Sequence, residues 1–455
     1  MAQKPRNIIV LIADSLRYDS VFDHGINLPY AQKHGVTFTE ARSAGCWTLP
    51  ATASIFTGLM PHEHGATSQS RAIHLSIPTL AEQMKAAGYS THQITANIAT
   101  TDIFGLNRGF DEVKRIWQFV SPEFNRLQRL LVIAGKPRIR QKLISKDALM
   151  NSMTSDLEMA TTWCQHTYPD VFQHCRDTIK ANEAKGKPSF IFLNLMETHF
   201  PYHIAPTFKL SQGGIYNKLR QIISMFHFLN QTFLKKDGEH IKRDMLNMLK
   251  KRQADAWLAI SNGVNDFLQE MHQDTGNLVV FGSDHGENFG ENGWTYHFSN
   301  VTDAGNKVPM FWLDHNGTSP RVEDRRVSTR HLYNSILHAV GLPKTGPSMV
   351  HDSDDSHPIM QSFWYNNHGS TMSKYKYNQI CFMIDEARYL WRNGNWFEAP
   401  FHTDMDEPKF SSLERDAHPL YDLKLDNRAK MEYLKVLADF SQFAGGIKFT
   451  EPHHH

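Results

Sequence analysis

Two carboxylates and an imidazole stand directly after apolar segments of the chain. Asp14 follows the apolar run 7–13 (NIIVLIA), and the pair Asp284–His285 follows the run 277–282 (NLVVFG). A carboxylate beside buried apolar residues is costly unless it is paired or bound to a metal. Asp and His side chains at strand–loop junctions can face one cation, so the pattern predicts a divalent metal site at these residues. Two other interpretations stay open: Asp14 as a helix cap, and the Asp–His pair as part of a surface loop.

A threonine opens another segment that is suited to chemistry. Thr48 begins the segment 48–58 (TLPATASIFTG), in which residues 50–58 are predicted to form a helix with Thr48 as its N-cap. A helix N-terminus favours an anionic group beside it. A threonine hydroxyl becomes a nucleophile when a divalent cation lowers its effective pKa. Capping and nucleophilic attack are compatible roles, so Thr48 is a candidate for both.

Buried strands that alternate with helices must position these side chains. The strands are predicted at 7–13, 90–95, 189–195 and 277–282, and the helices at 79–88 and 252–272. This alternation is typical of an α/β fold with a doubly wound, mostly parallel sheet flanked by helices, whose ligands lie beyond the carboxyl ends of the strands. Asp14, His199 and Asp284 each follow the end of a predicted strand, as that rule requires.

The pattern divides the chain into a catalytic domain over residues 1–345 and a small C-terminal subdomain over 346–455. Segments near 119–187 and 207–251 are predicted to be helical insertions that lid the site. In the C-terminal subdomain, Asn393–Gly394 predicts a hairpin between antiparallel strands, and residues 427–443 predict a terminal helix.

Taken together, these motifs resemble the sulfatase family of the alkaline phosphatase superfamily. The segment 48–58 is similar to the sulfatase signature Cys-x-Pro-Ser-Arg ending in Leu-Thr-Gly, with Thr48 at the position of the nucleophile. Threonine cannot be oxidised to formylglycine, and in this place it resembles phosphonate monoester hydrolases and phosphodiesterases. The chain departs from the family pattern at Thr52, where the signature has Arg, and at Ser15, where many relatives have a second Asp.

The resemblance implies roles for four further residues. His199, in the sequence His-Phe-Pro, and His297, ahead of a Val-Pro turn, match positions that contact the ester oxygen or the leaving group, where an imidazole donates a proton. Arg17 is a candidate charge partner for the substrate. Gln69 or, as the alternative, Ser68 is a candidate for the place of an Asn that touches a non-bridging oxygen in relatives.

The resemblance thus implies a metal-dependent hydrolase of phosphate or phosphonate esters, of the phosphodiesterase or phosphomonoesterase type. One divalent ion (Mn²⁺, Zn²⁺, Ca²⁺ or Mg²⁺) is expected at Asp14, Asp284 and His285, where it also binds Thr48. Thr48 is expected to form a covalent phospho-threonine intermediate. The alternatives are a sulfatase, a soluble transferase of the phosphoethanolamine type, and a binding protein on a catalytically decayed sulfatase scaffold.

Composition narrows the classes of partner. The 455 residues include 48 Lys and Arg against 47 Asp and Glu, so a nucleic-acid partner is not expected and a small-molecule ester substrate is. The four cysteines fit neither a zinc knuckle nor a disulfide framework, and no stretch reaches the ~20 apolar residues that span a bilayer. We therefore expect a cytoplasmic protein without a membrane span, and the sequence leaves open whether it forms a homo-oligomer.

Overall fold

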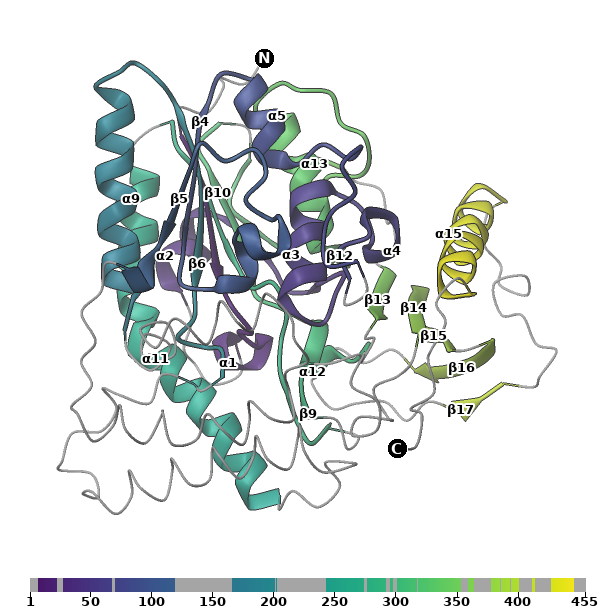
Figure 1. Ribbon diagram of the computed structural model, residues 1–455. Coiled ribbons are helices and arrows are strands. Elements are labelled where there is room, and N and C mark those ends of the chain that lie inside the picture. The colour runs from purple at the N-terminus through teal and green to yellow at the C-terminus, as the bar shows by residue number, and fades with distance from the viewer. Residues whose placement is uncertain are drawn as a thin grey trace, which may run out of the picture.

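The computed structural model in Figure 1 describes most of the expected catalytic domain and parts of the C-terminal region. The described residues are 7–22, 28–67, 70–118, 166–200, 202, 243–273, 276–291, 295–297, 301–316, 318–352, 359–363, 378–384, 386–392, 394–400, 411–413 and 427–445. The predicted lid segments 119–165 and 207–242 lie outside these ranges.

The centre of the molecule is an eight-stranded sheet in the order β11-β2-β10-β7-β1-β6-β4-β5. Strand β10 runs antiparallel to both of its neighbours, and the other pairs are parallel. The prediction of a mostly parallel sheet is therefore confirmed. The strands are β1 (Ile8–Ala13), β2 (Val36–Phe38), β4 (Ser90–Thr95), β5 (Glu112–Arg115), β6 (Ser189–Leu195), β7 (Leu278–Gly282), β10 (Met310–Asp314) and β11 (Arg321–Glu323).

Helices cover both faces of this sheet (Figure 1). Alternate residues of the fully buried β1 point into two separate cores, as strand geometry requires. One core receives α3 (Thr48–Thr57), α5 (Leu80–Ala86) and α13 (Leu332–Ala339). The other receives α2 (Pro29–His34), α9 (Tyr168–Glu183) and α11 (Arg243–Gln273).

Short elements complete the described part of this domain. They are α1 (Tyr18–Phe22), β3 (Ala41–Arg42), α4 (Pro61–His64), η1 (Ile98–Thr100), η2 (Asp102–Phe104), η3 (Ile116–Gln118), β8 (Asn288–Phe289), β9 (Thr295–Tyr296), α12 (Asp303–Asn306), β12 (Val327–Ser328) and η6 (Thr329–His331). Strand β3 pairs with β12 in parallel, and β8 pairs with β9 antiparallel.

Two helices differ from the predicted boundaries. The helix expected at 252–272 begins at Arg243, so residues 243–251 extend α11 rather than belonging to an insertion. Helix α9 falls within the insertion expected near 119–187, but its apolar side packs on the sheet core with residues of β4 and β6. Residues 168–183 therefore belong to the helix layer of the sheet.

The C-terminal region forms a separate antiparallel sheet. Its strands are β13 (Ile359–Phe363), β14 (Asn378–Ile384), β15 (Ala387–Arg392), β16 (Asn395–Pro400) and β17 (Ser411–Ser412), in sequential order. The predicted hairpin is confirmed, because Arg392 of β15 pairs with Asn395 of β16. Helix α15 (Asn427–Gly445) is the predicted terminal helix, and its Tyr433 packs on Phe382.

Among the described residues, no helix combines the length and the apolar character that crossing a membrane requires.

Candidate active site

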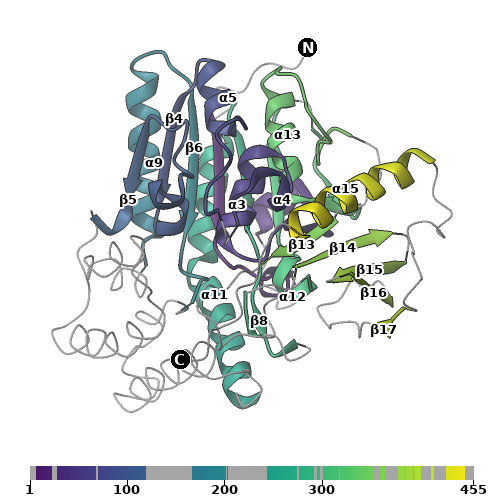
Figure 2. The ribbon, with the colours of Figure 1, turned by 45° about the vertical axis from the view of Figure 1, so that its right-hand side comes forward.

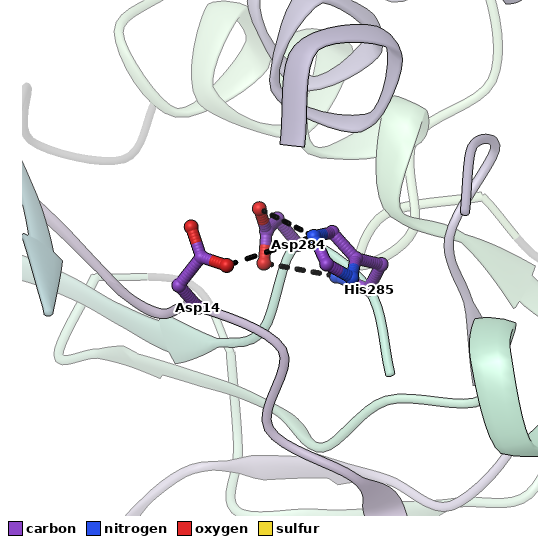
Figure 3. Close-up of side chains that lie close together, drawn as sticks. All are labelled: Asp14, Asp284 and His285. Carbon is purple, nitrogen blue, oxygen red and sulfur yellow. Dashed lines mark hydrogen bonds and ion pairs between the residues drawn. The ribbon is translucent and has the colours of Figure 1, made fainter. Parts of the chain in front are cut away.

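The carboxyl ends of β1 and β7 bring three metal-ligating side chains together. The two strands are parallel neighbours, with Ile12 opposite Gly282, so Asp14 and Asp284 leave the sheet at the same edge. Ligand atoms of Asp14, Asp284 and His285 all lie within 4.8 Å of one another, and all three residues are fully buried. Figure 3 shows their side chains pointing toward one another.

These three side chains suit a divalent cation. Nδ1 of His285 lies 2.9 Å from the carbonyl oxygen of Gly286, to which it can donate a hydrogen bond. In that tautomer Nε2 carries no hydrogen and faces the carboxylates, 3.6 Å from Asp14 Oδ1 and 3.5 Å from Asp284 Oδ2. Asp284 Oδ2 is buried and has no hydrogen-bond donor in the described part of the chain. Burial, and then repulsion from Asp14, raise the pKa of Asp284 well above its usual range. A cation would relieve both costs, and carboxylate and imidazole donors are ligands for divalent metals.

Neighbouring residues hold the two carboxylates. The amide of Ser15 donates to Asp284 Oδ1 at 3.2 Å, and its hydroxyl donates to Asp14 Oδ1 at 3.2 Å. Side-chain amides donate to Asp14 Oδ2 from Asn97 at 2.6 Å and from Asn194 at 3.4 Å. Neither Asn is predicted from the sequence to belong to the site. The available signal is that Asn97 follows the predicted strand 90–95, as Asp14 follows the predicted strand 7–13.

Thr48 lies beside these carboxylates at the start of α3. The helix begins at Thr48 itself, with Trp47 at the N-cap, so the prediction that Thr48 caps a helix starting at residue 50 is wrong. The Thr48 hydroxyl lies 3.4 Å from Asp14 Oδ2, 3.4 Å from His285 Nε2 and 3.5 Å from the amide nitrogen of Asn97. The fold thus brings the expected nucleophile to the expected metal ligands.

His199 and His297 line the same site. The ring centre of His297 lies 5.0 Å from that of His199 and 4.7 Å from that of His285. Nδ1 of His199 lies 2.7 Å from the carbonyl oxygen of Phe200. Burial, followed by the charges of the two neighbouring histidines, holds the pKa of His297 well below its usual range.

A carboxylate that is not predicted from the sequence contacts His297. Both carboxylate oxygens of the buried Glu287 lie 3.2 Å from His297 Nδ1, and Oε2 accepts a hydrogen bond from the Tyr202 hydroxyl at 3.1 Å. Burial raises the pKa of Glu287 to about 8. Strand β9 pairs Tyr296 with Asn288 of β8, which brings His297 beside Glu287. Tyr296 has a φ of +66°, a conformation that non-glycine residues rarely adopt.

The other two predicted substrate contacts have different outcomes. The Arg17 guanidinium is fully buried and donates to Asp19 at 2.8 and 2.7 Å, to the Glu287 carbonyl at 2.6 Å and to Glu291 at 2.8 Å. It is therefore engaged by protein groups, and this arrangement favours a structural role over the expected substrate contact. Gln69 lies outside the described residues.

Comparison with known proteins identifies the fold and the family of this chain. The mostly parallel sheet flanked by helices has an alkaline phosphatase-like fold. The chain belongs to the sulfatase family, whose model matches residues 6–342. No curated protein matches the sequence.

Solved structures share the fold at low sequence identity. A phosphonate monoester hydrolase from Silicibacter pomeroyi is 14% identical, with a TM-score of 0.59 and 95% of each chain covered. A phosphonate monoester hydrolase from Agrobacterium radiobacter is 15% identical, with a TM-score of 0.59, and 97% of this chain and 96% of that one are covered. A 2-O GAG sulfatase is 13% identical, with a TM-score of 0.56, and 99% of this chain and 95% of that one are covered.

Proposed function

We propose that this protein is a metal-dependent hydrolase of phosphate or phosphonate esters with Thr48 as its nucleophile. The observation that carries the proposal is the position of the Thr48 hydroxyl, 3.4 Å from both Asp14 and His285. A sulfatase attacks through formylglycine, which threonine cannot form. A threonine hydroxyl is instead suited to direct attack on phosphorus.

Asp14, Asp284 and His285 would hold one divalent cation, with the Thr48 hydroxyl beside it. The buried Oδ2 of Asp284, which has no hydrogen-bond donor among the described residues, supports this assignment. When bound, the cation supplies positive charge that lowers the pKa of the Thr48 hydroxyl and stabilises the phosphoryl oxygens. Its identity, among Mn²⁺, Zn²⁺, Ca²⁺ and Mg²⁺, is a matter for measurement.

The chain's own residues account for the bond changes. The Thr48 hydroxyl gives its proton to solvent, and its Oγ1 bonds to phosphorus as the bond from phosphorus to the leaving oxygen breaks. The departing alkoxide takes a proton from His199 or His297, whichever ring is protonated. The same imidazole then takes a proton from the attacking water, which releases the phosphoryl product, and the Thr48 oxygen regains its proton from solvent. The two ring centres lie 5.0 Å apart, which places both imidazoles in one part of the site, and the ring that carries a proton serves as the acid.

A sulfuric ester is the second candidate substrate. The family model and the 2-O GAG sulfatase among the structural neighbours favour it. Thr48 disfavours it, because the sulfatase nucleophile is absent from that position.

The test is hydrolysis of p-nitrophenyl esters after chelation and after addition of each of the four cations. The panel comprises a phosphate, a phenylphosphonate, a phosphodiester and a sulfate. We expect metal-restored turnover of a phosphorus ester, and a loss of roughly 10³-fold or more in Thr48→Ala. Thr57→Ala, at the other end of the buried helix α3, is the matched control and should retain turnover.

Two results would overturn the proposal. Turnover of the sulfate alone would assign the site to sulfuric esters. Full turnover of a phosphorus ester by Thr48→Ala would remove Thr48 from the nucleophile position.

A further inference from the structure

Helix α12 connects two loops of the candidate site. Its carbonyl groups accept backbone hydrogen bonds from the metal-ligand loop: Gly286 donates to Gly305 at 2.8 Å, and Glu287 donates to Ala304 at 2.9 Å. A Cβ on Gly286 would lie 2.2 Å from the Ala304 oxygen, so the loop and the helix are in direct contact. The position of α12 therefore determines where His285 and Glu287 lie.

The same helix holds the loop that leads to Thr48. The amide of Ser43 donates to the Asn306 carbonyl at 2.8 Å. The side-chain amide of Asn306 donates back to the carbonyl groups of Ser43 and Gly45, at 3.3 and 3.2 Å. Thr48 follows this loop directly, so a shift of α12 would move the nucleophile as well as the metal ligands.

Two buried arginines hold the first residue of α12. Arg42 of β3 donates to Asp303 through Nε at 2.9 Å and Nη2 at 3.0 Å, and Arg388 of β15 donates through Nη2 at 2.7 Å. All three side chains are at most 2% exposed. These contacts hold the pKa of the Asp303 carboxyl well below its usual range. Removing one partner of such a buried pair is strongly destabilising, because it leaves a charge uncompensated.

Arg388 comes from the C-terminal sheet, far along the sequence from the residues it contacts. It is the second residue of β15 and lies opposite Met383 of β14 and Ala399 of β16. Figures 1 and 2 show this sheet beside α12. The apolar residues of the sheet also pack against Ala44, next to the Ser43 loop, and Met60, just beyond α3.

We propose that Arg388 is a positioning residue for the candidate active site, through which the C-terminal sheet fixes α12 and with it the Thr48 and His285 loops. The proposal rests on the proposed function only in taking these loops as the reacting site. It gives the C-terminal sheet a part in catalysis through the position of α12.

The test compares Arg388→Met with Arg392→Met by hydrogen exchange and by turnover. Arg392 lies on the same strand, is half-buried and donates to Gln379 within the C-terminal sheet at 2.9 Å. We expect Arg388→Met to accelerate amide exchange in peptides covering 42–48 and 283–291, and to lower kcat by about 10²-fold, because small displacements of reacting groups are costly. Arg392→Met should leave both regions as in the wild type.

Wild-type exchange at 42–48 and 283–291 in Arg388→Met, with faster exchange only in the C-terminal strands, would overturn the proposal. If Arg388→Met does not fold, Arg388→Lys takes its place, because lysine keeps the positive charge but lacks the planar guanidinium. Its amide exchange is measured in the same two peptides. Exchange is read without substrate or metal. A wild type that hydrolyses no ester would therefore refute the proposed function while the exchange result still decides the role of Arg388.

Discussion

The candidate site has two halves that are built in different ways. The metal half consists of Asp14, Asp284 and His285, which extend directly from the ends of β1 and β7. The histidine half consists of His199, His297 and Glu287, which lie in loops beyond the strand ends. In the metal half, the paired strands β1 and β7 end just before Asp14 and Asp284, and His285 follows in the loop that α12 holds. In the histidine half, side-chain hydrogen bonds and the short pairing of β8 with β9 position the residues.

We therefore expect the two halves to have different functions. Groups carried by a sheet are held rigidly, which suits ligands that must keep a cation in fixed geometry. Loop residues that are oriented by one another are easier to disturb singly, and each has its own effect on proton transfer. Substitutions in the metal half should therefore change metal binding, and substitutions in the histidine half should change rates while the metal stays bound.

The largest expected effect is that of Asp284→Asn. The change removes an anionic metal ligand. Loss of a group that only hydrogen-bonds a ligand lowers metal affinity by up to roughly 100-fold, so we expect a larger fall here. Bound metal per chain, measured by elemental analysis after dialysis against Mn²⁺, should drop with turnover.

Asp314→Asn is the control for this substitution. Asp314 also stands at a strand end, but β10 is antiparallel and pairs Asp314 with Leu278, at the opposite edge of the sheet. Its variant should keep the wild-type metal content. Full occupancy in Asp284→Asn would mean that the metal half is assigned to the wrong residues.

The two halves also differ in how well the sequence predicts them. The runs 7–13 and 277–282 are buried strands by pattern alone, and parallel neighbours necessarily place Asp14 and Asp284 at one edge. Glu287 gives no such signal, because its contact with His297 depends on the pairing of two-residue strands, β8 and β9, which are too short to predict from a pattern.

Arg17 shows the limit of reasoning from proximity in sequence. It stands three residues after Asp14, which favours a role in the site. In the folded chain its guanidinium is engaged by Asp19, two residues on, and by Glu291, 274 residues away. The doubly wound fold, by contrast, follows from strand and helix patterns that are local and repeated.

Glu287→Gln tests the histidine half. Both oxygens of the Glu287 carboxyl group contact Nδ1 of His297, whereas glutamine offers one oxygen, so the ring is less firmly held. We expect kcat to fall by roughly 10²-fold for esters with poor leaving groups, where proton donation matters most. Esters with p-nitrophenol as leaving group should lose much less, and metal content should stay at the wild-type level. The measurement is a series of aryl esters that differ in leaving-group pKa.

Glu197→Gln is the matched control. Glu197 is equally buried and stands two residues before His199, but it accepts from the backbone amides of Thr167 and Tyr168 at 2.6 and 2.8 Å, which a glutamine oxygen can also do. An equal loss of rate across the ester series in Glu287→Gln would indicate a general structural role. Loss of bound metal in Glu287→Gln would mean that the histidine half also contributes to metal binding.

The smallest expected effect is that of Ser15→Ala, within the metal half. Alanine keeps the backbone amide that donates to Asp284 and removes only the hydroxyl that donates to Asp14 at 3.2 Å. We expect Mn²⁺ affinity, measured by titration of the metal-free protein, to fall about 10-fold, at the low end for a partner of a metal ligand. The rate at saturating metal should match that of Ser335→Ala, a buried serine on α13 that bonds the His331 carbonyl at 2.8 Å. Unchanged affinity would show that the strand ends alone hold Asp14. A lower saturated rate would mean instead that the two halves of the site act as one unit.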